Sequence, residues 1–151
     1  MAPRVTRRTA LLLISLALSL AFAGWQWFRP YDWSSDPEAR FRIVHSSLKR
    51  DHSFVWLDLY LKQSGDLPHD LSKPVVLRLA DGREVEPADT TIEGDEGQPV
   101  RAIGFRFWLE EQDFAGPLDL KLNDGSLRVR TGSGLPAIPD GGAKFFTTRN
   151  W

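Results

Sequence analysis

The amino-acid sequence predicts an all-β domain, a two-sheet antiparallel sandwich, preceded by one N-terminal transmembrane or signal helix. Two observations predict the sandwich. From residue 40 onward, apolar and polar residues alternate with the period of two that is typical of strands with one face on a core. Turn-forming residues recur about every ten residues, and no helical period follows residue 30. A third observation, an apolar run before residue 30, predicts the helix.

The N-terminal helix is expected over the apolar segment 10–28, after a short basic N-terminus, 1–9. At a rise of 1.5 Å per residue this segment gives a helix of about 28 Å, close to the hydrocarbon thickness of a bilayer. Arg4, Arg7 and Arg8 precede it, whereas one basic residue follows it directly. Because cytoplasmic flanks carry an excess of Lys and Arg, we expect a single-pass protein of the cell (inner) membrane, with its domain on the periplasmic or extracellular side.

Cleavage of this segment is one alternative. Ala21 and Ala23 form the small-x-small pattern that signal peptidase accepts, and Gly24 follows. Cleavage after Ala23 would release a secreted protein that begins at Gly24.

Retention of the segment as a signal anchor is the other alternative, and the one that we expect. Trp25, Trp27 and Phe28 lie where the aromatic belt at a membrane interface would be. After cleavage, the same three side chains would be exposed to water at the new N-terminus without benefit.

A short linker is expected over 29–39, because its Pro, Ser and acidic residues favour neither helix nor strand. Tyr31 and Trp33 within it could dock on the domain or lie at the level of the lipid headgroups, and the headgroup level is the simpler expectation for aromatic residues next to a membrane helix. The sandwich domain is expected over 40–151.

Seven strands, approximately, are expected in this domain. The segment 54–62 is the clearest, because four aliphatic residues share one face and aromatic and polar residues share the other. Asp81-Gly82 and Asn123-Asp124-Gly125 supply tight hairpin turns. The expected strands are 40–47, 54–62, 75–79, 83–86, 100–109, 118–122 and 127–130.

Other parts of the domain are not expected to form strands. The segment 87–99 is rich in Gly and acidic residues and is expected to be an exposed loop, whereas 110–116 is expected to form one helical turn. In the tail, Phe145, Phe146 and Trp151 are expected to pack on the sandwich and hold the C-terminus in place.

Strand number and spacing match the architecture of an immunoglobulin or fibronectin type III sandwich. The similarity is limited to architecture, because the chain has no Cys and so lacks the Cys-Trp-Cys core of antibody domains. The absence of Cys also excludes disulfides, thiolate metal sites and cysteine nucleophiles. After Arg8, 16 Lys and Arg are interleaved with 20 Asp and Glu, which argues against a nucleic-acid partner.

Aromatic residues form the main candidate for a binding site. Phe54, Trp56 and Tyr60 share the outward face of the strand 54–62, and Trp108 has the equivalent position on the strand 100–109. Such a face could receive a sugar ring or a partner's side chain, or it could instead form half of a packed core or be covered by the chain termini.

Catalytic and metal-binding signatures are not recognisable in the sequence. His45, His52 and His69 have a spacing that matches no compact metal motif, and the acidic residues within 93–96 lack the order of a calcium loop. No serine lies in a nucleophile elbow. We therefore expect no enzyme activity, no cofactor and no metal.

Two functions remain from the sequence. The first is a membrane-anchored, non-catalytic interaction module that binds another protein of the cell envelope. The second is a secreted carbohydrate- or ligand-binding domain that uses the aromatic face. They differ in whether the mature chain begins at Gly24.

Overall fold

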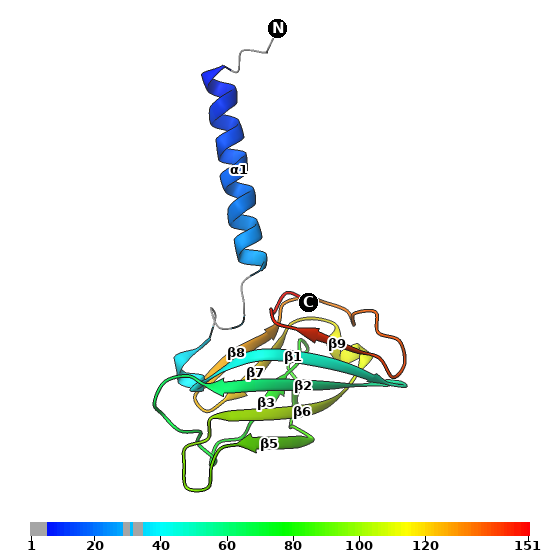
Figure 1. Ribbon diagram of the computed structural model, residues 1–151. Coiled ribbons are helices and arrows are strands. Elements are labelled where there is room, and N and C mark those ends of the chain that lie inside the picture. Colours follow the sequence, from blue (N-terminus) through cyan, green and yellow to red (C-terminus); the bar gives the residue numbers. More distant parts are fainter. Residues whose placement is uncertain (1–5, 29–30, 32–34) are drawn as a thin grey trace.

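The computed structural model describes residues 6–28, 31 and 35–151, and it consists of one N-terminal helix and a mostly β domain (Figure 1). Two antiparallel sheets face each other, with the five-stranded sheet in front in Figure 1. Nine strands form these sheets in the described part of the chain, two more than expected. Trp33, for which a position at the headgroup level is expected, lies outside the described residues.

Both sheets are antiparallel throughout. In spatial order, the five-stranded sheet consists of β5 (Asp89–Glu93), β6 (Ala102–Glu110), β2 (Phe54–Gln63), β1 (Phe41–Asp51) and β9 (Ala143–Phe146). In the same order, the four-stranded sheet consists of β4 (Glu84–Val85), β3 (Val76–Arg78), β7 (Leu118–Leu122) and β8 (Gly125–Arg130). Two short 3₁₀ helices, η2 (Pro37–Ala39) and η3 (Glu111–Phe114), complete the domain.

The core lies between the two sheets and is supplied by every second residue of their central strands. On β2 the buried positions are the four aliphatic residues that the alternation predicts, and on β6 the buried residues include Ile103, Phe105 and Phe107. Leu120 and Leu127 approach them from the four-stranded sheet within one continuous cluster. The prediction of two antiparallel sheets with a shared core is therefore confirmed.

Strand β5 corrects the expectation of a loop over 87–99. It pairs with β6 along its whole length, with Thr91 opposite Gly104. All five of its residues are exposed, because β5 is an edge strand whose side chains contribute nothing to the core. Its polar composition therefore resembles that of a loop. The expected helical turn after β6 is confirmed by η3.

Strand β9 is the other strand that the alternation does not reveal. It pairs with β1 in four positions, with Phe146 opposite Ser46 and Phe145 opposite Ser47. Phe146 stacks on Trp151 with ring centroids 4.4 Å apart, as expected for a pinned tail. The expectation is wrong for Phe145, which is 74% exposed, because neighbouring residues of a strand point to opposite faces.

Helix α1 spans Arg7–Trp27, so it begins three residues before the expected apolar segment. The Thr6 hydroxyl caps it by accepting a hydrogen bond from the Thr9 amide at 3.3 Å. None of its residues is buried, and its length corresponds to about 31 Å. The helix is long and apolar enough to cross a membrane, a property that signal peptides share.

Tyr31 joins the helix to the domain, and its position differs from the expected headgroup level. The residue is 3% exposed and its hydroxyl donates to the Val129 carbonyl at 2.5 Å. The same oxygen lies 3.1 Å from the Ser46 hydroxyl and accepts from Trp151 Nε1 at 2.9 Å. Two residues separate Tyr31 from Phe28, so the end of the helix lies within about 11 Å of the core.

Arg130 is a buried cation next to the side chains that surround Tyr31. Arg130 packs between the rings of Trp151 and Phe114, with its Cζ 4.8 Å and 5.8 Å from their centroids. Its Nη2 donates to the Gly134 carbonyl at 2.9 Å, and burial lowers the pKa of the guanidinium. Burial raises the pKa of the Tyr31 phenol. The stability that the neutral phenol contributes is therefore present below pH about 10 and is lost as the pH rises through the raised pKa.

Removing the Tyr31 hydroxyl tests this junction. We expect Tyr31→Phe to lower the free energy of unfolding by about 1–3 kcal/mol, because it leaves buried polar groups unpaired. Tyr60→Phe is the matched control, because the only other tyrosine of the chain lies on the surface, and its cost should stay below about 1 kcal/mol. Urea unfolding of the full chain in detergent measures both, and equal losses would contradict the assigned role of Tyr31.

Candidate functional site

The four aromatic residues singled out from the sequence all lie on the outer face of the five-stranded sheet, and none belongs to the core. Trp108 is 50% exposed and Phe54 is 37% exposed, while Trp56 and Tyr60 are half-buried. They face outward because the residues between them on β2 and β6 point into the core. The alternative that this face forms half of the packed core is therefore wrong.

Three of the four residues gather into one cluster, which we call the aromatic patch: Phe54, Trp56 and Trp108. Trp56 and Trp108 are direct partners in the β2–β6 register, and their ring centroids lie 4.8 Å apart. Phe54 meets Trp108 edge to face with centroids 4.9 Å apart. Edge-to-face and tilted contacts of this kind hold aromatic rings in fixed orientations.

Polar partners surround Trp56 within this patch. Its Nε1 donates to Asp51 Oδ2 at 3.4 Å, and the Arg106 guanidinium lies 5.7 Å from its ring centroid. Arg106 also donates twice to Asp58, at 2.7 Å and 3.2 Å, and these bonds raise the pKa of the guanidinium. The ring of Trp56 is therefore oriented by neighbours that leave part of its surface accessible.

Tyr60 lies apart from the patch, because the Asp58–Arg106 pair stands between them on the sheet. Its ring stacks on His45 with centroids 5.1 Å apart. Its hydroxyl donates to Glu93 Oε2 at 3.1 Å, and this hydrogen bond raises the pKa of the phenol. The structure thus brings together three of the four predicted residues and assigns Tyr60 to a second, polar group.

A groove of about 510 Å³ lies beside Tyr60, and we call it the Gly104 groove. Gly104 is the partner of both Tyr60 and Thr91 in the sheet, so it lies between strands β2 and β5. The Tyr60–Glu93 hydrogen bond connects β2 with β5 across β6. It crosses β6 near Gly104, which has no side chain. The residues that line the groove are His45, Ser47, Asp58, Leu59, Tyr60, Asp89, Thr91, Glu93, Gly104, Phe105 and Arg106.

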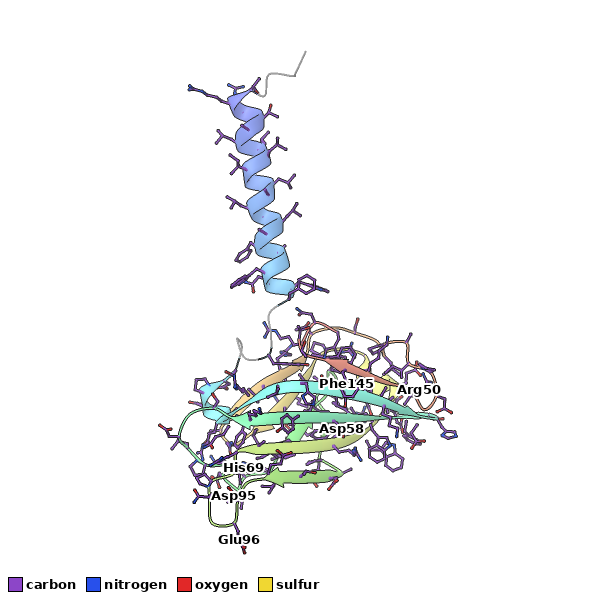
Figure 2. The ribbon with its side chains drawn as sticks, viewed as in Figure 1. Arg50, Asp58, His69, Asp95, Glu96 and Phe145 are labelled. Carbon is purple, nitrogen blue, oxygen red and sulfur yellow. The ribbon has the colours of Figure 1, made fainter. Side chains whose placement is uncertain are left out.

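Sequence reasoning missed this groove. The available signal was a glycine inside a strand, which often marks the close approach of a ligand or of another backbone. Asp89, Thr91 and Glu93 were missed as well, because they belong to the strand that was expected to be a loop. In Figure 2, Asp58 of the groove lies near the middle of the five-stranded sheet, and Phe145 marks the edge strand β9.

The candidate residues of the N-terminal segment lie on α1. Ala21, Ala23 and Gly24 form part of its last two turns, together with Trp25 and Trp27. Phe28 caps the helix, and its amide donates to the Gly24 carbonyl at 3.0 Å. The Asn150 side-chain amide donates to the Trp27 carbonyl, which is a second contact between helix and domain besides Tyr31.

The three histidines lie in different places. His45 stacks on Tyr60, His69 Nδ1 lies 2.9 Å from Asn123 Oδ1, and His52 Nδ1 lies 3.0 Å from Asp51 Oδ1. The contact with Asp51 raises the pKa of His52. Within 6–28, 31 and 35–151, no three His, Asp or Glu side chains converge as metal ligands.

The exposure of the patch predicts how its residues contribute to stability. Trp108→Ala should lower the free energy of unfolding by about 1 kcal/mol, because it removes only surface ring contacts. Phe107→Ala is the matched control on the same strand, and it should cost about 3–5 kcal/mol because Phe107 is fully buried. Urea unfolding measures both, and similar losses would mean that Trp108 belongs to the core.

Comparison of the chain with protein-family models, with curated proteins and with solved structures finds no match. A function for this protein therefore rests on its geometry: an outward-facing aromatic patch, a polar groove beside it, and a terminal helix joined to the domain through Tyr31.

Proposed function

We propose that this chain is a membrane-anchored, exported and non-catalytic interaction module of the cell envelope, which binds a protein partner through the aromatic patch. One observation carries this proposal: Trp108 is 50% exposed and packs against Trp56 and Phe54 on an open sheet face. Tryptophan is enriched among the residues that dominate protein interfaces, and clustered exposed rings favour burial by a partner.

Membrane anchoring through α1 is part of the proposal. Support comes from the exposed apolar surface of the helix and from the basic residues before it, which favour a cytoplasmic N-terminus and a periplasmic or extracellular domain. The Tyr31 junction also favours retention, because cleavage after Ala23 would leave Trp25, Trp27 and Phe28 as an exposed extension of a docked segment.

An immunoglobulin- or fibronectin-like arrangement of the sandwich is likewise proposed. The two antiparallel sheets with one shared core support it. In such sandwiches a sheet face can serve for recognition without any catalytic group, which is consistent with a binding role.

A secreted carbohydrate- or ligand-binding domain is the second candidate function. The flat rings of Trp56 and Trp108 beside the hydrogen-bonding Asp58–Arg106 pair favour it, because sugars present both an apolar face and hydroxyl groups. The mass of the mature chain separates the two candidates: a chain that begins at Gly24 supports secretion, and a chain that retains α1 supports the anchored module.

A photoreactive amino acid at position 49, the exposed position opposite Trp56 on β1, tests the proposed docking when it is introduced in the cells that produce the protein. We expect a protein adduct of defined mass, reduced tenfold or more by Trp56→Ala because the patch acts as one unit. Position 121, on the outer face of the four-stranded sheet, is the control and should give no such adduct. Equal crosslinking at both positions, or an adduct at 49 that Trp56→Ala leaves unchanged, would contradict the proposal.

A further inference from the structure

The Gly104 groove lies on the same sheet face as the aromatic patch, next to it along the strands. On β2 the outward positions run from Trp56 through Asp58 to Tyr60, so Tyr60 lies about 13 Å along the strand from Trp56, and Asp58 of the groove lies between them. A protein interface of ordinary size covers about 800 Å² on each partner. One docked protein would therefore cover both the patch and the groove.

Glycine at position 104 is explained by the space above it rather than by its backbone. Its φ is not positive, and a Cβ atom there would meet the Thr91 Cβ at 3.6 Å, an ordinary contact. Glycine inside a strand is destabilising relative to alanine. The missing side chain leaves space above the sheet beside the Tyr60 ring. A glycine inside a strand often marks a place where a ligand approaches the backbone closely.

The groove carries an excess of negative charge. Of the described residues that line it, Arg106 is the one cation, and its guanidinium is paired with Asp58. Asp89 is the register partner of Arg106 and adds to the raised pKa of its guanidinium, and Glu93 accepts the Tyr60 hydrogen bond that raises the pKa of that phenol. Three carboxylates, Asp58, Asp89 and Glu93, therefore face one guanidinium in the groove.

We propose that the Gly104 groove receives a lysine or arginine side chain of the protein that docks on the aromatic patch. The aliphatic stem lies over Gly104 beside the Tyr60 ring, and the cationic group lies between Asp89 and Glu93. This proposal deepens the proposed function and rests on it, since the basic residue belongs to the same partner.

Three features favour this occupant. Aromatic rings pack well against the apolar stems of long side chains, and carboxylates form strong hydrogen bonds with ammonium and guanidinium groups. Lysine and arginine also combine a long apolar stem with a charged end, which matches a groove with Gly104 in its lining and acidic side chains beside it. An anionic ligand would meet repulsion from Asp89 and Glu93.

Amide chemical shifts of the full chain in detergent micelles provide the test. The probes are N-acetyl-lysine amide and its uncharged counterpart N-acetyl-norleucine amide, with cellobiose as a neutral sugar. We expect the lysine probe alone to shift the amides of 89–93 and 104–106 saturably, with millimolar affinity. Raising the salt concentration from about 0.05 M to 0.5 M should weaken this binding severalfold.

Two variants remove different properties of the groove. Gly104→Leu fills it, and the double variant Asp89→Asn with Glu93→Gln removes its charge without changing its volume; each should weaken lysine binding tenfold or more. Unshifted core amides report that each variant is folded. Lys121→Ala is the control, because position 121 lies on the outer face of the four-stranded sheet, and it should leave lysine binding unchanged.

The proposal is overturned if the lysine probe gives no saturable shift, if norleucine amide binds equally well, or if cellobiose binds the groove without salt dependence. Its failure is distinguishable from failure of the docking itself. Crosslinking at position 49 without lysine binding would refute only the groove, and lysine binding without crosslinking would refute only the docking.

Discussion

The hydrogen bond from the Tyr31 hydroxyl to the Val129 carbonyl is the constraint on which the arrangement of this protein depends. It brings the segment after the helix into a core that also includes Ser46 of β1 and Trp151 of the tail. One buried side chain thereby connects the helix, both sheets and the C-terminal segment. Because two residues separate Tyr31 from Phe28, the domain cannot move far from the end of α1.

This short connection determines how the five-stranded sheet is presented. In Figure 1 the strands of this sheet lie one below another beneath the helix, with β9 nearest the helix and β5 farthest from it. Its inner face is closed by the core, so its outer face is the part of the sheet left for recognition. On that face the aromatic patch is an apolar surface, and the Gly104 groove beside it is a hollow lined by acidic side chains. The Asp58–Arg106 pair lines the groove, and its guanidinium also lies over the Trp56 ring of the patch.

Local patterns in the sequence were sufficient for part of this description. Alternation along β2 and β6 places Trp56 and Trp108 on a common face, since facing in or out is a property of neighbouring residues. It does not reveal β5, whose residues are all exposed, or the junction at Tyr31, which depends on contacts with residues far along the chain. The separation of Tyr60 from the patch follows from the register and from Glu93 on that unrecognised strand.

Hydroxyl-radical footprinting of the full chain, in native membranes and after purification, is the most direct measurement of whether the outer face is a docking surface. The rings of Phe54, Trp56 and Trp108 should be modified readily in the purified chain and several times more slowly in native membranes, where the partner is present. Leu71, which is 77% exposed outside this face, should react equally in both samples. Equal modification of the three rings in the two samples would contradict the account.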